Sequence, residues 1–481
     1  MPESDQETHQ VRDTYDVVVV GGGPVGENAA ARVVRGGLSA VVVEAELVGG
    51  ECSYWACTPS KALLRPGTAV DAARHVAGAA EAVTGRLDVS AVLGRRDSFT
   101  AQWDDAGQVE WLAGAGVDLV RGRGRLGGAR RVEVTGEDGS TRVLSARHAV
   151  VLATGSRPTV APIEGLADVE HWGTREATAA QEVPESLAVI GGGVAGAELA
   201  QVFARLGSRV TLVARSRLLG RFPDPAARLV AEALDAEGVT LLEGRSTEAV
   251  RPGGEGVELV LDDGATVSGQ RLLVATGRHP ALEDLGREQF GLDVTAVQVD
   301  PSGLVAGVDG AWLYAVGDAA GTAPLTHQGK YEARAAGDAI VARAARQLGG
   351  EVRPWSRYAA TADGPAVPQV VFTDPAVATV GRTVEQAEEA GLAVDTVERD
   401  IDVAGAALHR DGYRGWAQLV IDRDRRVVVG ATFAGPGVAE LLHAATVAIV
   451  GEVPLERLWH AVPVFPTVSE VWLRLLEDYG L

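Results

Sequence analysis

The stretch from Asp16 to Gly26, DVVVVGGGPVG, joins a β-branched run to a glycine-rich turn, and a helical pattern at residues 27–35 follows directly. A similar stretch at residues 187–196, LAVIGGGVAG, also leads into a helical pattern. Each glycine turn and helix is followed by another apolar strand, at residues 40–43 and 209–213. This internal echo predicts an α/β protein with two doubly wound, Rossmann-like nucleotide-binding units.

The internal repeat also includes the strand that closes each unit. Residues 150–155, VVLATG, close the first unit, and residues 272–277, LLVATG, close the second. A further strand pattern at residues 312–316 ends in Gly317 and Asp318. The two halves therefore share both their opening turn and their closing strand.

From about Arg353 onward the pattern of predicted strands and helices differs from that of the two repeated units. Two strands that read as alternating, at residues 416–421 and 427–433, are followed by a helical pattern at 438–450. This order of elements predicts a separate α+β domain at the C-terminal end of the chain.

Length and charge limit the classes of protein to which the chain can belong. The 481 residues suggest about three domains. A net charge of -21 argues against a nucleic-acid partner and for a well-solvated acidic surface. Residues 1–14 are polar and are expected to form a disordered tail. No apolar run reaches the roughly 18 residues of a membrane helix, so a cytoplasmic protein without a membrane partner is expected.

The first glycine turn has the features of a pyrophosphate site. A helix N-terminus offers unpaired N–H groups and the positive end of a dipole. Gly21 permits the tight turn, Gly23 lets phosphates approach, and Gly26 lets helix and strand pack closely. Glu44 ends the next strand, where an acid can accept hydrogen bonds from an adenosine ribose. The alternative is an ordinary glycine-rich turn.

The second turn repeats these glycines as Gly191, Gly193 and Gly196, with Gly277 at the closing strand. Its strand-end acid position is taken by Ala214, and Arg215, Arg217 and Arg221 follow. Without the acid a 2′-phosphate is not repelled, and arginine can hold it. This favours NADPH over NADH. The alternative is a solvated arginine loop, and Gly196 itself weakly favours NADH.

The two cysteines of the chain are neighbours, in the run GGECSYWACTPSK at residues 49–61. In a regular helix the Cα atoms of Cys52 and Cys57 would be about 8.6 Å apart, more than the roughly 7 Å that a disulfide allows. The backbone between them must therefore be irregular. An accessible pair at a helix start suits reversible reduction, with two structural thiols as the alternative.

With these motifs, the chain resembles the flavoprotein pyridine nucleotide-disulfide oxidoreductases of the lipoamide dehydrogenase, glutathione reductase and mercuric reductase group, from about Tyr15 to Tyr479. The motifs that carry the resemblance are C-x4-C-x-P-S-K, the two glycine turns, the two ATG segments, Gly317-Asp318 and the run FTDP at residues 372–375. The resemblance implies FAD and NAD(P)H as cofactors and a homodimer.

The resemblance also implies roles for single residues. Cys57 would lie against the flavin as a thiolate, and Cys52 would exchange with the acceptor. Lys61 would sit near the flavin N5 and pair with Glu198. The residues implied in FAD binding are Gly21, Gly23, Gly26, Glu44, Gly50, Lys61, Thr154, Gly155, Asp318, Leu325, Thr326 and His327. For His327, a capping or packing role is the preferred reading.

One departure from the family pattern concerns the histidine of its C-terminal motif, His-Pro-Thr-x-x-Glu. Here the run is FPTVSE, with Phe465 at the histidine position and Glu470 kept. A phenyl ring cannot move a proton. His460 lies five residues upstream and reads more readily as a surface or interface residue. Mercuric reductase is disfavoured because its additional C-terminal cysteines are absent.

The predicted organisation is an FAD-binding domain at residues 15–165 and 283–352, an NADPH-binding domain at 166–282 and a dimerisation domain at 353–481. We expect an oxidoreductase that passes electrons from NADPH through FAD to the Cys52–Cys57 pair. The acceptor is open: a quinone, another electrophile or an unusual disulfide. A lipoamide-type dehydrogenase with a substitute base and a non-enzymatic redox sensor are the alternatives.

Overall fold

The computed structural model describes residues 12–254, 256–293 and 297–481. Contacts among these residues divide the chain into two compact units. The first holds the described residues up to Tyr54, with Trp103–Arg157 and Arg278–Thr361. The second holds Trp55–Gln102, Pro158–Gly277 and Ala362–Leu481. The FAD, NADPH and dimerisation boundaries given above stay predictions.

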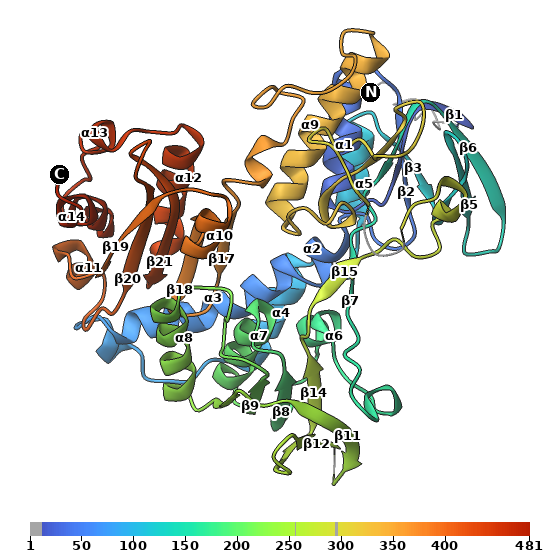
Figure 1. Cartoon of the computed structure of the whole chain (residues 1–481). Helices are drawn as coiled ribbons and strands as arrows, with labels where there is room; N and C mark the ends of the chain where they lie inside the picture. Colours follow the sequence, from blue (N-terminus) through green and yellow to red (C-terminus); the bar gives the residue numbers. More distant parts are fainter. Residues whose placement is uncertain (1–11, 255, 294–296) are drawn as a thin grey trace, which may run out of the picture. The chain divides into compact units, whose positions relative to one another are not determined.

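The first unit contains the first glycine turn and its doubly wound sheet (Figure 1). Its main elements are β1 (Thr14–Val20), α1 (Pro24–Arg35), β2 (Ala40–Glu44), α2 (Gly50–Tyr54), α5 (Ala106–Gly114), β3 (Asp118–Arg121), β4 (Arg123–Gly128), β5 (Arg131–Thr135), β6 (Thr141–Leu152), β7 (Ser156–Pro158), β15 (Arg278–Pro280), β16 (Leu313–Ala315) and α9 (Thr326–Ala344).

The strand order of its main sheet is β3-β2-β1-β6-β5-β4, and β16 pairs with β6. β1 is parallel to both β2 and β6, with Val18 opposite Val41 on one side and Val150 on the other. The early half of β6 instead pairs antiparallel with β5. The valines of β1 are buried on both faces of the sheet. Val17 and Val19 pack with residues of α1 and α9, whereas Val18 and Val20 pack with residues of β4 and β5 and of the chain after β15.

Helices α1 and α9 lie side by side in this unit (Figure 1). Small residues let them approach closely: a Cβ on Gly329 would come within 2.6 Å of a methyl group of Val25. Farther along, Arg32 forms a bidentate pair with Asp338, with both N–O distances 2.7 Å. This packing fixes the N-terminus of α1, where the glycine turn ends.

The second unit contains the second glycine turn, the cysteine-bearing helix and the C-terminal α+β part. The elements up to Gly277 are α3 (Cys57–Arg74), α4 (Val89–Phe99), α6 (Thr174–Ala179), β8 (Ser186–Ile190), α7 (Val194–Arg205), β9 (Arg209–Ala214), α8 (Asp224–Ala236), β10 (Thr240–Glu243), β11 (Thr247–Gly253), β12 (Gly256–Leu261), β13 (Thr266–Gly269) and β14 (Arg271–Val274). The order β10-β9-β8-β14 forms a parallel sheet, and β11-β12-β13 form an antiparallel one.

The C-terminal part of this unit is an antiparallel sheet with the order β17-β18-β21-β20-β19. Its elements are β17 (Pro368–Val371), β18 (Ala376–Gly381), α10 (Val384–Glu389), β19 (Val394–Asp400), α11 (Ala404–His409), β20 (Trp416–Asp422), β21 (Val427–Gly435), α12 (Leu442–Val450), α13 (Leu455–Leu458) and α14 (Val471–Asp478).

The expected alternation of buried and exposed residues in β20 and β21 is wrong. Every residue of β21 and all but one of β20 are buried. The physical reason is that β21 is contacted by both α12 and α8, so its residues meet protein on either side. The helix expected at residues 438–450 is split into a 3-10 turn, Val438–Leu441, and α12.

The expected tail at residues 1–14 falls mostly on residues 1–11, which lie outside the described part of the chain. Thr14 already belongs to β1, so the strand begins two residues earlier than the sequence pattern indicated. Within the described residues, no helix combines the length and the apolar character needed to cross a membrane.

Candidate active site

The first glycine turn has the close contacts that a pyrophosphate loop requires. Gly21 has φ +105°, and a Cβ there would lie 2.3 Å from the carbonyl oxygen of Ala153. A Cβ on Gly26 would lie 1.9 Å from the oxygen of Gly21. Around Gly23, by contrast, the nearest atom to such a Cβ is 3.9 Å away. The turn is therefore tight at its ends and open where phosphates are expected.

Gly50 brings the start of α2 against this turn. Its φ is +56°, and a Cβ on Gly50 would lie 2.9 Å from the Cα of Gly23. Any larger residue would push α2 away from the glycine turn. The segment that leads to the cysteines is thus anchored on the nucleotide loop.

Glu44 ends β2 beside the same turn. Its Oε2 accepts a hydrogen bond of 2.6 Å from the N–H of Gly22, and its Oε1 accepts one of 2.7 Å from Glu46. Burial raises the pKa of this carboxyl, while the backbone donors act in the opposite direction. The side chain is placed as expected for a ribose-binding acid, although both oxygens already have backbone partners.

Glu27 is a buried acid that the sequence reasoning missed. It lies in the first turn of α1, and its Oε1 is buried with no hydrogen-bond partner among the described residues. Burial raises its pKa to about 7, and the charge of Glu44 adds to the rise while Lys330 opposes it. A polar atom left unpaired beside the open glycine turn fits a site built to hold a ligand.

Thr154 and Gly155 brace the chain where it returns to the first unit. The hydroxyl of Thr154 donates to the carbonyl of Ala281 at 2.8 Å, and the N–H of Ala281 donates to Gly155 at 2.9 Å. In the second unit, the hydroxyl of Thr276 donates to the carbonyl of Thr159 at 2.9 Å. In both ATG segments the threonine hydroxyl therefore donates to a backbone carbonyl of a segment distant in the sequence.

Asp318 belongs to a hydrogen-bonded network in the first unit. It accepts a bond of 2.5 Å from the hydroxyl of Ser156, which in turn accepts one of 2.8 Å from Arg278. Arg278 also reaches Glu51, the neighbour of Cys52, at 3.4 Å. Ser156 and Arg278 were not predicted, although both directly follow the ATG segments that were.

Leu325, Thr326 and His327 form the N-cap and first turn of α9. Their contact with the flavin stays a prediction. His327 is exposed. The preferred interpretation of His327, a capping or packing role, stays a prediction.

The irregular backbone expected between the two cysteines is confirmed. Helix α2, which contains Cys52, ends at Tyr54, and α3 begins at Cys57. Ala56, in the break, has φ -135° and ψ -94°. Both cysteines are half-buried. Their pairing as a disulfide stays a prediction.

Lys61 and Glu198 form the ion pair that was expected. The Nζ of Lys61, on α3, is 2.7 Å from Oε2 of Glu198 on α7, and the Glu198 side chain is 4% exposed. Oε1 of Glu198 accepts the N–H of Phe372 at 2.9 Å. The ring of Phe372 lies under the ammonium group, 5.0 Å from Nζ to the centroid. The FTDP run therefore helps to hold this pair.

Close packing of α3 on α7 produces this geometry. A Cβ on Gly67 would lie 2.6 Å from Cδ of Arg205, so a larger residue would require this side chain to shift. Arg205 is fixed by Glu237 at 2.7 Å and by Asp374 at 3.0 Å. Leu63 and Leu64 join the apolar core that includes Leu199.

The second glycine turn repeats the first. Cβ atoms on Gly191 and Gly196 would lie 2.3 Å from Ala275 O and 1.9 Å from Gly191 O, whereas one on Gly193 would meet nothing within 4 Å. Gly277 has φ +119° at the closing strand. This turn too leaves room for a phosphate at its middle glycine.

The arginines after Ala214 divide into two kinds. Arg217 is bonded to the loop itself, donating to the carbonyl of Phe222 at 2.5 Å. Arg215 and Arg221 are exposed and have no ion pair within the described ranges. Glu243 lies opposite Ala214 on the neighbouring strand and accepts the N–H of Leu218 at 2.5 Å. The sequence reasoning missed this acid because it comes from another strand.

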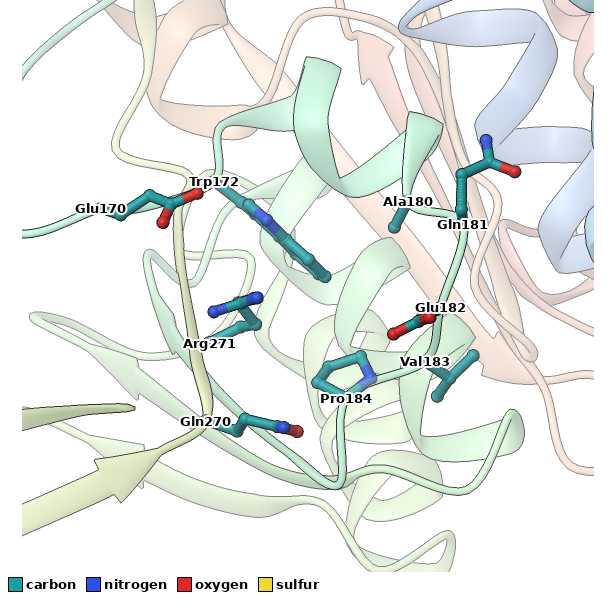
Figure 2. A pocket seen from close by; sticks show the side chains of 9 residues that line it. All are labelled: Glu170, Trp172, Ala180, Gln181, Glu182, Val183, Pro184, Gln270 and Arg271. Atoms are coloured by element: carbon teal, nitrogen blue, oxygen red, sulfur yellow. The ribbon is translucent and has the colours of Figure 1, made fainter. Parts of the chain in front are cut away.

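The second unit holds a cavity of about 290 Å³. Trp172, Glu182, Pro184 and Arg271 are among the residues that line it (Figure 2). Strands β8 and β14 begin beside it, at Ser186 and Arg271. Ligands of parallel α/β sheets bind at the carboxyl ends of the strands. The cavity lies at the amino ends, so it is not the nucleotide site.

The C-terminal motif presents Phe465 to solvent, with the side chain 72% exposed. Glu470 is buried and pairs with Arg474 at 2.7 Å, and its second oxygen has no hydrogen-bond partner among the described residues. His460 is exposed. The carboxylate that would orient a histidine is thus present, while the residue at the histidine position is apolar.

Comparison with known proteins gives the same family throughout. Residues 15–338 match the model of the pyridine nucleotide-disulphide oxidoreductases, and residues 367–475 match their dimerisation domain. A mercuric reductase of Streptomyces lividans is 34% identical over 94% of both chains. A dihydrolipoyl dehydrogenase of Chlorobaculum tepidum is 31% identical over 97% of both.

Solved structures show the same fold. The Cu(II) complex of the HOCl-induced flavoprotein disulfide reductase RclA from Escherichia coli has a TM-score of 0.81 at 23% identity, covering 97% of this chain and 99% of that one. LpdA from Mycobacterium tuberculosis has a TM-score of 0.80 at 24% identity, with the same coverage. The chain belongs to the pyridine nucleotide-disulphide oxidoreductases, enzymes that use FAD and NAD(P)H.

Proposed function

We propose that the enzyme takes electrons from NADPH and passes them, through FAD and a Cys52–Cys57 disulfide, to an acceptor other than lipoamide. FAD, when bound, supplies the two-electron relay between the nicotinamide and the cysteines. The observation that carries the proposal is the ion pair between Lys61 and Glu198. Lys61 lies four residues after Cys57 on the same helix. It provides a fixed positive charge at the start of α3.

The residues of the first unit support FAD binding. Gly23 leaves the backbone open to a pyrophosphate, Gly21 and Gly50 permit the close contacts on either side of it, and the dipole of α1 favours the charge of the pyrophosphate. Glu44 faces the same turn for the ribose. Asp318, held by Ser156, would take a hydroxyl group of the ribityl chain.

The residues of the second unit support NADPH rather than NADH. Arg215 directly follows Ala214, and both Arg215 and Arg221 are exposed, so that either can meet a 2′-phosphate. Glu243 on the adjacent strand opposes this preference by its negative charge. We therefore expect a preference that depends mainly on Arg215.

The nucleotide preference is tested by stopped-flow reduction of the bound flavin with NADPH and with NADH. The wild type is expected to be reduced more efficiently by NADPH, and R215E to shift toward NADH, because a carboxylate repels the 2′-phosphate. R228E, which changes an exposed arginine on α8, serves as the control. Equal efficiency with NADH in the wild type would contradict the preference.

The acceptor is limited by Phe465. In dithiol exchange, the Cys52 thiolate attacks one sulfur of the acceptor disulfide, and the leaving thiolate needs a proton. A phenyl ring cannot supply it. Acceptors that do not need this proton relay, such as quinones, are therefore favoured. The chain has only two cysteines, which disfavours mercuric ion as the acceptor, although a mercuric reductase is among its relatives.

A lipoamide-type dehydrogenase with a substitute base is the second candidate, because dihydrolipoyl dehydrogenases are relatives of the chain over nearly its whole length. His460 would be the base, since it lies five residues before Phe465 and is exposed. The non-enzymatic alternative is set aside by membership in an enzyme family.

Turnover of dihydrolipoamide separates these candidates. The wild type is expected to be slower than an enzyme with the histidine by about 10²–10⁴-fold, the usual contribution of general acid–base catalysis. F465H is expected to recover part of this rate, because Glu470 is already present to orient the ring. F465L is the matched control and should recover nothing.

Two outcomes would change the proposal. Robust wild-type turnover of lipoamide that is abolished by H460A would establish the substitute base. Fast quinone turnover that survives C52S would show that this acceptor does not need the disulfide. The same preparation should bind FAD non-covalently, and protein without flavin after reconstitution would end the proposal.

A homodimer is part of the proposal, because residues 367–475 match a dimerisation domain. The motif with Phe465 and Glu470 would then face the cysteines of the partner subunit. The exposure of Phe465 in the single chain is consistent with a surface that another copy covers.

A further inference from the structure

Trp55 is the largest residue between the two cysteines, and helix α6 holds it in two ways. The guanidinium carbon of Arg175 lies 3.9 Å from the centre of the Trp55 ring system. The hydroxyl of Thr178 donates a hydrogen bond of 2.9 Å to the backbone carbonyl of Trp55. Both the ring and the backbone of the residue two before Cys57 are therefore fixed from one short helix.

Helix α6 has only six residues and needs support of its own. Arg96 on α4 supplies it: the side chain is fully buried and donates to the carbonyls of Thr178 and Ala180 at 2.7 and 2.8 Å. These carbonyls belong to the C-terminal end of α6, where a cation is favoured. Asp97 balances the buried charge at 2.7 Å.

The other side of the break is fixed by the first turn of α3. The N–H and the hydroxyl of Ser60 both donate to the carbonyl of Ala56, at 3.1 and 2.6 Å. Trp55 is thus held by α6 and Ala56 by α3, so the backbone that enters Cys57 has little freedom. An ordinary helix would not fix the chain here, because α2 ends at Tyr54.

We propose that Arg175 and Trp55 form a clamp that positions Cys57 for its role as the flavin-facing thiolate. Arg175 acts through Trp55 and is a positioning residue. This inference rests on the proposed function, in which Cys57 carries that thiolate. The stack needs a planar cation over an aromatic face, so lysine replaces arginine only in part.

The test uses the holoenzyme and three variants of similar side-chain length. R175M removes the charge and keeps an aliphatic stem, R175K keeps the charge without the planar group, and R95M removes a comparable surface stack on α4. In that control pair, Arg95 lies 4.6 Å from the Phe99 ring centre. These substitutions keep the volume of the side chain, so folding is expected to survive.

Each protein is reduced anaerobically by two electrons, and the long-wavelength absorption of a thiolate against oxidised flavin is followed as pH is varied. In R175M we expect the band to weaken by at least about twofold and its pH midpoint to move, since thiolate absorption depends on contact and local charge. R175K is expected to fall between R175M and the wild type, and R95M to match the wild type.

A second readout is the rate at which iodoacetamide alkylates Cys57 in the reduced protein, followed by mass spectrometry. R175M is expected to change this rate, whereas a purely structural role would leave both the rate and the pH midpoint unchanged. Wild-type behaviour of R175M in both measurements would overturn the clamp. A wild type without the band would overturn the proposed function itself, and the inference with it.

Discussion

Glu27 places a buried carboxyl group beside the first glycine turn, where a pyrophosphate is expected. It lies in the first turn of α1, and burial raises its pKa to about 7. The groups that face it are Glu44 from β2, which raises the pKa, and Lys330 from α9, which lowers it. A protonated Glu27 would offer a donor to a phosphate or ribose oxygen, and an ionised one would repel the phosphate.

The titration of Glu27 gives a pH dependence of stability with a definite sign. Its pKa in the folded chain, about 7, lies above the ordinary 4.5, so at intermediate pH the unfolded chain has lost a proton that the folded chain keeps. The free energy of unfolding therefore falls as pH rises through this window and levels off above it. E27Q removes the titration and should be more stable than the wild type at about pH 8, on the order of 2 kcal/mol.

Thermal unfolding midpoints at about pH 5 and about pH 8 measure this difference. The midpoint of E27Q should fall less between the two values than that of the wild type. E110Q, which changes an exposed acid on α5, is the control and should behave as the wild type does. Parallel pH dependence in E27Q and the wild type would show that Glu27 does not titrate in this range.

Single residues differ in how far the sequence predicts them. Gly21 and Gly26 could be identified because a turn of fixed spacing needs glycine at both, and the structure places a backbone oxygen where each Cβ would lie. Glu27 and Glu243 could not be identified from the sequence. Glu27 matters because it is buried, and Glu243 because it lies opposite Ala214 on a strand distant in the sequence. Spacing predicts local turns, whereas burial is decided by the whole fold.

Among the secondary-structure elements, α3 connects the cysteine motif to the nucleotide-binding helix of the second unit. The sequence predicted the helix start, and the family resemblance predicted the pairing of Lys61 with Glu198 on α7, whereas the close approach at Gly67 was not predicted. The contact depends on Gly67 lying over Arg205 and on Lys61 reaching Glu198. One ion pair and one close approach, about two helical turns apart, therefore set how α3 and α7 lie against each other.

G67A tests this contact. Alanine favours a helix by about 1 kcal/mol over glycine, but the added Cβ meets Arg205, and overpacking typically costs about 1–3 kcal/mol. Because Arg205 is held by Glu237 and Asp374 and cannot move freely, we expect G67A to lower the unfolding midpoint.

In an R205A background the same substitution should be neutral or stabilising, since the clash is removed and only the helix propensity remains. Thermal unfolding of the four proteins in this cycle gives the coupling between the two positions. An equal effect of G67A in both backgrounds would show that α3 has room at Gly67 and that Arg205 does not limit its approach.

For the whole molecule, the exposed apolar residues of the C-terminal segment are the main feature that a single chain leaves unexplained. Val462 and Val464 are 83% and 73% exposed, beside Phe465 at 72%. Isolated exposed apolar residues are common, but three within four positions mark an interaction surface. The family match assigns this segment to a dimerisation domain, and no feature of its sequence pattern alone indicated that the residues lie in solvent.

V464D is therefore expected to weaken the homodimer, because a buried carboxylate at an interface must lose its hydration. Light scattering across a protein dilution series should show a wild-type dimer and a shift of V464D toward monomer of at least about tenfold in dissociation constant, or 1.4 kcal/mol. V160D is the control, since Val160 is 67% exposed and lies outside the dimerisation domain.

Reduction of bound flavin by NADPH should survive in the monomer, because both nucleotide turns belong to one chain. Turnover that needs the cysteines and the partner's C-terminal motif should fall in proportion to the dimer lost. A wild type that is monomeric at micromolar concentration with full acceptor turnover would show that one chain completes its own active site.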